Sequence, residues 1–164
     1  MEEATLRLNI GAGNEIIEGF KSVDLYMPAD IKDDITKLST IEDNSIDEVL
    51  TYHLLEHLRN DDVLPAMQSV FRVLKPGKQW KIEVPNLMWL FDDFINTPDH
   101  ERWGWKIQTI FGLQNHEGEY HRTGFSVQRL KSMLESVGFV KVEVCSSFSE
   151  KYNQEIIDAV AVKP

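Results

Sequence analysis

The stretch that decides the fold is Leu6-Arg7-Leu8-Asn9-Ile10-Gly11-Ala12-Gly13. Residues 6–10 predict a short strand, and the strand runs directly into a loop with two glycines. Glycines at this point let a ligand approach the backbone closely, because neither presents a Cβ and both adopt positive φ. The loop therefore predicts a site for an adenosine-containing cofactor at the end of the first strand of an α/β domain.

The rest of the chain alternates strand and helix patterns. Strands are predicted over residues 21–25, 29–35, 46–52, 79–84, 139–144 and 156–162, and the charged 29–35 segment suits a sheet edge. Helices are predicted over residues 61–74, with Asp61 as N-cap, and over residues 126–137, from Ser126 to the stop at Gly138. Such alternation predicts one doubly wound, mostly parallel seven-stranded α/β domain over residues 1–164, with ligands beyond the carboxyl ends of the strands.

Composition limits the classes of partner. The chain has 164 residues, and its formal net charge of -10 opposes binding to nucleic acid and to anionic lipid, so neither is expected. No run approaches the roughly 18 apolar residues of a membrane span, and Met1-Glu2-Glu3 is acidic where a signal peptide would be basic. A single cysteine, Cys145, has no intramolecular partner. A soluble protein in the cytoplasm is expected.

Two acids mark the edge where the cofactor is expected. A dinucleotide fingerprint would require a third glycine where Ile16 stands, which argues against a nicotinamide-dependent oxidoreductase. Asp24 ends the second strand and could accept hydrogen bonds from both hydroxyls of a ribose, or could be a turn acid that contributes little to the core. Asp34 could accept from an adenine amine while the Ile35 N–H contacts the ring, or the Asp33-Asp34 pair could be a solvated edge.

Several phrases resemble class I S-adenosylmethionine-dependent methyltransferases in order and spacing. They are Leu8-Asn9-Ile10-Gly11-Ala12-Gly13, Val23-Asp24-Leu25, Asp34-Ile35-Thr36-Lys37-Leu38, Asp43-Asn44-Ser45-Ile46-Asp47-Glu48-Val49, His53-Leu54-Leu55-Glu56-His57-Leu58 and Arg72-Val73-Leu74-Lys75-Pro76-Gly77. The later His121-Arg122-Thr123-Gly124-Phe125 resembles a small branch of type-11-like methyltransferases whose substrates are mostly undefined. The resemblance covers nearly the whole chain.

The resemblance implies a Rossmann-like sheet with an antiparallel last strand and S-adenosylmethionine as the cofactor, leaving S-adenosylhomocysteine as product. It implies that the cofactor is bound by Asn9, Gly11, Ala12, Gly13, Asp24, Leu25, Asp34, Ile35, Tyr52 and His53. Members often carry an acid where Asn9 stands and a third glycine where Glu15 stands. Asn9 can still hydrogen-bond the amino or carboxylate group of the cofactor, without the charge that attracts an ammonium.

Two histidines are the candidate catalytic residues. His53 follows the fourth strand beside the expected methyl group, as a base or a substrate contact, although with Glu56 and His57 it could instead form a local hydrogen-bonded turn. His121 belongs to the irregular segment of residues 96–124, which is expected to be a substrate loop or lid, or else it is a surface histidine.

No metal site is expected. The segment of residues 99–121 is rich in histidine and glutamate, with His100, Glu101, His116, Glu117, Glu119 and His121. None of their spacings matches a compact ligand motif such as His-Glu-x-x-His.

The sequence as a whole predicts a methyltransferase that acts on a small molecule or carbohydrate, with oxygen as the acceptor atom and a monomeric or homodimeric state. The alternative is a module that binds S-adenosylmethionine without catalysis.

Overall fold

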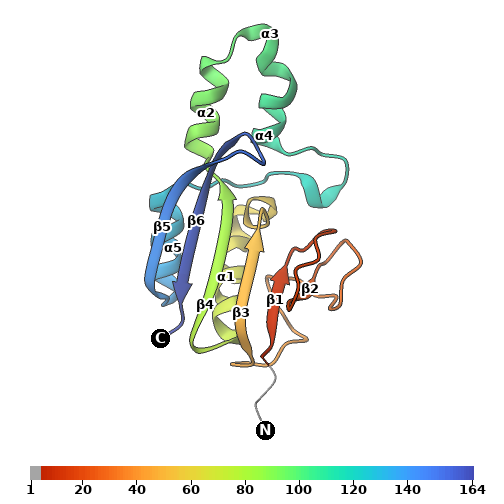
Figure 1. Ribbon diagram of the computed structural model, residues 1–164, viewed down its shortest axis with the longest axis vertical. Coiled ribbons are helices and arrows are strands. Elements are labelled where there is room, and N and C mark those ends of the chain that lie inside the picture. Colours follow the sequence, from red (N-terminus) through yellow and green to blue (C-terminus); the bar gives the residue numbers. More distant parts are fainter. Residues whose placement is uncertain (1–4) are drawn as a thin grey trace.

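A six-stranded mixed sheet forms the centre of the chain in the computed structural model, which describes residues 5–164 (Figure 1). The strand order is β2-β1-β3-β4-β6-β5. The strands are β1 (Arg7–Ile10), β2 (Lys21–Val23), β3 (Ile46–Tyr52), β4 (Leu74–Pro85), β5 (Val140–Ser149) and β6 (Gln154–Val162). Met1-Glu2-Glu3, on which the argument against a signal peptide rests, lies outside the described residues.

Strand directions follow the expected Rossmann-like arrangement. β1 pairs in parallel with β2 and β3, and β3 pairs in parallel with β4. β6 runs antiparallel to both β4 and β5. The α/β fold and the antiparallel last strand are thus confirmed. The parallel strands β1 to β4 bring their carboxyl ends to one edge of the sheet.

The predicted strand over residues 29–35 is reduced to a single bridge between Val23 and Ile31. Local hydrogen bonds compete with strand pairing here. Asp30 accepts from the backbone and hydroxyl of Ser22, and Asp33 accepts from the backbone and hydroxyl of Thr40. The sheet therefore has six strands over the described residues where seven were expected.

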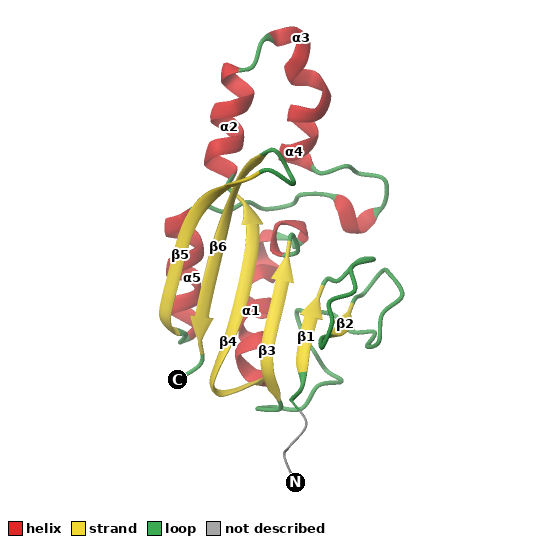
Figure 2. Ribbon diagram, viewed as in Figure 1, coloured by secondary structure: helices red, strands yellow, loops and turns green. Residues whose placement is uncertain are grey.

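Two amphipathic helices, α1 (Val63–Val73) and α5 (Val127–Val137), cover one face of the sheet (Figure 2). Helix α5 begins as predicted, with the Ser126 hydroxyl accepting from the Arg129 N–H at 3.2 Å, and it ends at Gly138 in a left-handed conformation. Helix α1 differs at its start. Its N-cap is Asp62 rather than Asp61, and no side chain caps it. A short 3-10 turn, η2 (Asn60–Asp62), precedes it.

The core lies between the sheet and these helices. The indole N–H of Trp80 donates to the Thr51 hydroxyl at 3.0 Å, and both side chains are fully buried. On the opposite face of β4, Lys81 pairs with Glu48 at 2.8 Å, as the period of two in this strand predicts. A doubly wound sheet has a helical layer on each face. In the described residues, a helical layer covers one face.

A set of helices projects beyond the carboxyl-end edge of the sheet (Figure 1). It comprises α2 (Leu87–Asn96), α3 (Asp99–Glu101), the π-helical turn η3 (Arg102–Lys106) and α4 (Ile107–Phe111). The segment expected to be irregular, residues 96–124, is therefore partly helical. Among residues 5–164, none of the helices has the length and apolar content needed to cross a bilayer.

Candidate functional site

The glycine loop follows β1 in the conformation that its sequence predicts. Gly11 and Gly13 have φ of 72° and 54°, and the Gly11 N–H donates to the Val23 carbonyl at 2.8 Å. A Cβ on Gly11 would lie 2.6 Å from Leu54 Cδ1, so a glycine is needed both for the turn and for the close approach of Leu54. A Cβ on Gly13 would meet nothing within 4 Å. Gly13 thus presents bare backbone to open space.

Asp24 links the glycine loop to the end of β2. One carboxylate oxygen accepts from the Gly13 N–H at 2.9 Å, and the other accepts from the N–H groups of Tyr26 and Met27 at 2.7 and 2.8 Å. The side chain is buried yet lines a cavity. Asp24 is therefore both the turn acid of the alternative interpretation and a carboxylate placed toward a ligand.

Asp33 and Asp34 have different environments. Asp33 is buried and accepts from Thr40, and burial, which alone would raise its pKa, is outweighed by hydrogen bonds that lower it. Asp34 lines the cavity with Ile35, and one of its carboxylate oxygens accepts from the Thr36 N–H. Asp33 also lines the cavity, but both of its carboxylate oxygens accept hydrogen bonds within its own loop, so Asp34 is the better candidate of the two for a ligand contact.

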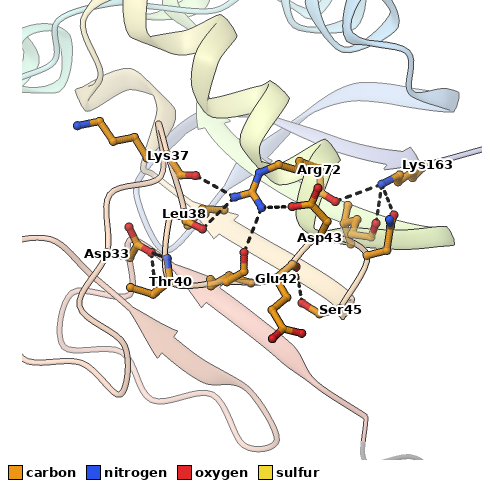
Figure 3. A network of polar contacts seen from close by, with 12 residues as sticks. Asp33, Lys37, Leu38, Thr40, Glu42, Asp43, Ser45, Arg72 and Lys163 are labelled. Carbon is orange, nitrogen blue, oxygen red and sulfur yellow. Dashed lines mark hydrogen bonds and ion pairs between the residues drawn. The ribbon is translucent and has the colours of Figure 1, made fainter.

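Arg72 on α1 holds the segment that follows Asp34. Figure 3 shows its guanidinium directed at the backbone of residues 37–43. It donates to the carbonyls of Lys37 and Leu38, each at 2.9 Å, and to that of Ile41 at 3.1 Å, and it pairs with Asp43. The cavity wall at residues 34–37 is thus fixed by a helix on the far side of the loop.

His53 follows β3 and has an unusual backbone, with φ of 49° in a non-glycine residue. Its Nδ1 lies 3.1 Å from Glu56 and its Nε2 lies 3.0 Å from Glu83. Burial alone would lower the pKa of His53, but its hydrogen bond to Glu56, its close contact with Glu83 and the charges of these two residues raise the pKa to about 9. His53 is therefore protonated at neutral pH, and both ring nitrogens are engaged.

A cavity of about 570 Å³ lies at the carboxyl ends of β1, β2 and β3. Most of the predicted cofactor residues line it, namely Gly11, Gly13, Asp24, Leu25, Asp34, Ile35 and His53. Ala12 and Tyr52 are not among its lining residues. Asn9 lies instead beside a second cavity, of about 380 Å³, with its side-chain nitrogen buried and unpartnered. The placement of Asn9 does not support its expected contact with the cofactor.

The opposite wall of the cavity contains residues that were not singled out from the sequence as site residues. They are mainly polar and include His57, Arg59, Asp62, His116, Glu117, Glu119 and Arg122. His57 comes from the 3-10 turn η1 (Leu55–His57), and Glu117 and Glu119 come from η4 (Glu117–Glu119). The phrase around His53 gave a signal for His57, and the substrate loop expected over residues 96–124 includes the 116–122 segment, but the sequence did not indicate which of its residues line the cavity.

Backbone contacts attach this returning segment to η1. The N–H groups of Arg122 and Thr123 donate to the Glu56 carbonyl at 2.8 and 3.2 Å, and His57 Nδ1 lies 3.2 Å from the Tyr120 carbonyl. His121 does not line the cavity, and its ring contacts His57 edge-on with centroids 4.9 Å apart. The segment thus closes one side of the cavity, and His57 stands between His121 and the open space.

The donor and acceptor groups suit the chemistry of S-adenosylmethionine. The bare backbone at Gly13 leaves open space beside the loop, and Asp24 and Asp34 present carboxylate groups to the cavity, where such groups can accept hydrogen bonds from hydroxyls and amines. Gly11, Leu25 and Ile35 complete that side of the cavity.

The fold is that of class I S-adenosylmethionine-dependent methyltransferases. An S-adenosylmethionine-dependent methyltransferase from Archaeoglobus fulgidus matches 98% of this chain and 86% of its own length, with TM-score 0.66 and 19% identity. One from Methanosarcina mazei matches 99% and 94%, with TM-score 0.67 and 16% identity. The 1,6-didemethyltoxoflavin-N1-methyltransferase of Burkholderia thailandensis matches 98% and 72%, with TM-score 0.67 and 16% identity.

The family model of the methyltransferase domain matches residues 19–80, which hold Asp24, Asp34, His53 and His57. A search of the curated proteins found no match. Residues 19–80 thus match a methyltransferase-domain family, and the solved structures show that the chain has the fold of S-adenosylmethionine-dependent methyltransferases.

Proposed function

We propose that the chain methylates an oxygen atom of a small polar molecule or carbohydrate. The observation that carries this proposal is the shape of one cavity, which runs from the glycine loop and Asp24 to the polar wall of His57, Glu117 and Arg122. One end suits an adenosine group, and the other offers several hydrogen-bonding side chains to an acceptor.

The cofactor end is assigned by hydrogen-bonding capacity. We assign Asp24 to the ribose hydroxyls and Asp34, with the Ile35 N–H, to the adenine. When bound, S-adenosylmethionine supplies a methyl group whose bond to sulfur breaks as a bond to the acceptor oxygen forms, leaving S-adenosylhomocysteine. The protein must orient the acceptor in line with that bond, and orientation can contribute about 7 to 11 kcal/mol.

The acceptor end must also remove the proton of a hydroxyl. His53 is poorly suited as a base, because its pKa of about 9 keeps it protonated at neutral pH. Burial lowers the pKa of His121, against the opposing charge of Glu56, so this ring is unprotonated at neutral pH. We therefore assign His53 as a positioning residue, and His57 with His121 behind it as the acceptor end of the site.

The acceptor class is also supported by a structural relative. The Burkholderia thailandensis protein acts on 1,6-didemethyltoxoflavin, a small molecule, although it methylates nitrogen. In this chain, Arg122 pairs with Glu117 at the cavity wall, and His116 pairs with Glu119 at 3.5 Å. Such alternating donors and acceptors suit a molecule with several hydroxyl groups.

The proposal is tested with methyl-labelled S-adenosylmethionine and a panel of sugars, hydroxylated metabolites and amines. The expected result is release of S-adenosylhomocysteine together with label on an acceptor oxygen. Label on nitrogen would contradict the choice of oxygen. Binding of the cofactor without turnover on any acceptor would favour a binding module, and absence of binding at millimolar concentration would overturn the proposal as a whole.

A further inference from the structure

Three side chains that could ligate a metal ion meet behind the wall of the cavity. Glu56, His57 and His121 each offer one ligand atom, and these atoms all lie within 4.8 Å of one another. Glu56 and His57 belong to η1, while His121 is brought in by the segment that returns from α4. The three residues combine two imidazoles and one carboxylate.

Glu56 carries the clearest sign that a partner belongs here. Its side chain is only 2% exposed, and one carboxylate oxygen bonds His53 Nδ1 at 3.1 Å. The other oxygen, Oε2, is buried without a hydrogen-bond partner. A buried carboxylate oxygen without a donor or a cation is costly, so an unpartnered one in a cluster of ligand atoms indicates a missing positive group.

A backbone carbonyl orients His57. His57 Nδ1 lies 3.2 Å from the Tyr120 carbonyl, which can only accept, so Nδ1 carries the proton and Nε2 keeps its lone pair. Metal-ligating histidines commonly donate their second ring N–H to a carbonyl or carboxylate, which fixes the tautomer and the ring orientation.

The path of the chain supports the same arrangement. Gly112 has φ of 82°, and a Cβ there would collide with the carbonyl of Glu119. The His121 N–H donates to the Phe111 carbonyl at 3.0 Å. The end of α4 and the segment before His121 are thus packed backbone to backbone, which delivers His121 to Glu56 from a fixed direction.

We propose that Glu56, His57 and His121 bind a divalent transition-metal ion of the Zn²⁺ class. Two imidazoles and one carboxylate are a donor set that Zn²⁺ accepts in open, three-ligand sites. Ligands about 2.1 Å from a tetrahedral ion are about 3.4 Å apart, so small side-chain rotations would close the present spacing. The ligands are 64 residues apart in sequence, from His57 to His121, which is why a compact motif is absent.

The ion would have two consequences. It would fasten the returning segment to η1, directly behind the cavity wall that His57 forms. It would also hold His57, whose side chain lines the acceptor end of the cavity, in a fixed position toward an acceptor. This second use rests on the proposed methyl transfer, whereas binding of the ion does not.

The test uses the full chain without a histidine tag, stripped with a chelator and then titrated with Zn²⁺ or Co²⁺. We expect about one ion per chain, a visible Co²⁺ spectrum of a four-coordinate N/O site, and a higher melting temperature with Zn²⁺. We test three variants, His57→Ala, His121→Asn and Glu56→Gln. The affinity of each for Zn²⁺ should fall by more than the roughly 10-fold to 100-fold that is typical when a residue that only hydrogen-bonds a metal ligand is removed.

The matched control is His100→Ala, because the His100 side chain is 79% exposed and pairs with its neighbour Glu101 at 3.2 Å. This variant should bind Zn²⁺ as the parent chain does. Absence of binding by the parent, unchanged binding by a His57→Ala/His121→Asn double variant, or loss of binding on Cys145→Ser would overturn the proposal. Circular dichroism of each variant separates loss of a ligand from loss of the fold, and none of these measurements depends on methyl transfer.

Discussion

The carboxylate of Asp24 accepts a hydrogen bond of 2.9 Å from the backbone N–H of Gly13. This bond joins the end of β2 to the glycine loop after β1, so the acid expected to bind the ribose also shapes the loop that the cofactor must pass. The second carboxylate oxygen accepts from the N–H groups of Tyr26 and Met27. Asp24 therefore contributes to the fold as well as to the cavity, contrary to the expectation that it contributes little to the core.

Replacing Asp24 with alanine should weaken both cofactor binding and the fold. Three backbone N–H groups would lose their acceptor, which we expect to lower the free energy of unfolding by about 1 to 3 kcal/mol. Affinity for S-adenosylhomocysteine should fall by roughly 10-fold or more, measured by calorimetry, because the ribose loses its acceptor.

The control for this change is Asp30→Ala. Asp30 accepts from the Ser22 N–H at 2.8 Å in the same loop but does not line the main cavity. Its loss should lower stability without changing the affinity for S-adenosylhomocysteine. Unchanged affinity in Asp24→Ala would show that the ribose assignment is wrong.

Much of the cofactor side was predictable, because it depends on local patterns. Strand β3 has the predicted bounds. Asp24, Asp34 and His53 all line the cavity at the edge of the sheet where the parallel strands end. Their roles were less predictable. The protonation of His53 depends on Glu83, which comes from β4, and pairing between strands cannot be read from the residues around His53 alone.

The acceptor side was not predictable in the same way. His57 and His121 are in contact because Gly112 lets the chain double back along the end of α4, and this path is set by tertiary packing. Similarly, the lost strand at residues 29–35 depends on Asp30 and Asp33 bonding to their own turns instead of to a neighbouring strand. Periodicity alone does not report either effect.

Replacing Gly11 with alanine should remove cofactor binding, and Gly77 offers a matched control. Both glycines have similar positive φ, 72° and 76°, so an alanine at either position has a backbone strain of roughly 1 to 2 kcal/mol. Only at Gly11 would the new Cβ collide with Leu54, whereas at Gly77 it meets nothing within 4 Å.

We therefore expect the free energy of unfolding of Gly11→Ala to be lower than that of Gly77→Ala by roughly 1 to 3 kcal/mol, because of overpacking against Leu54. Its affinity for S-adenosylhomocysteine should fall with it, while Gly77→Ala keeps the affinity of the parent. Urea denaturation and calorimetry measure the two effects. Equal losses of stability in both variants, with cofactor affinity retained, would contradict a role for the close approach of Leu54.

Arg72 should influence cofactor binding although it lies outside the cavity. Arg72→Ala removes three hydrogen bonds to the backbone of residues 37–41, and we expect a loss of about 1 to 3 kcal/mol in unfolding free energy, reduced by the partial exposure of the guanidinium. The backbone carbonyl of Asp34 accepts hydrogen bonds from the N–H groups of Lys37 and Leu38, the residues that Arg72 holds. Loss of Arg72 should therefore also disturb Asp34 and weaken binding of the adenine.

Asp43→Asn is the comparison for Arg72, since it removes the charge partner and leaves the backbone carbonyls in place (Figure 3). It should have a smaller effect on both stability and affinity than Arg72→Ala. Denaturant unfolding and calorimetry with S-adenosylhomocysteine give both values. An equal effect of the two variants would assign the role of Arg72 to the exposed ion pair instead of to the backbone contacts.

His53 should make stability depend on pH between about 6.5 and 9. The folded state holds its pKa at about 9 because Glu56 and Glu83 outweigh the effect of burial, while an unfolded histidine titrates near its ordinary value of 6.5. Raising a pKa on folding means that the stabilising contribution is fully present below pH 6.5 and is lost as the pH rises through about 9. The ring also contacts Tyr152 edge-on, with centroids 4.2 Å apart.

Melting temperatures measured from pH 6 to pH 9.5 should therefore fall with rising pH in the parent chain, and the fall should be shallower in His53→Gln. Glu83→Gln removes one of the two carboxylates, so it should move the midpoint of the fall to lower pH and leave the contact with Glu56 in place. Groups that do not interact with His53 contribute equally to all three proteins, so the difference between their curves reports on His53 and its partners. Parallel curves for the parent and His53→Gln would show that His53 is not held protonated, and would restore it as a candidate base for methyl transfer.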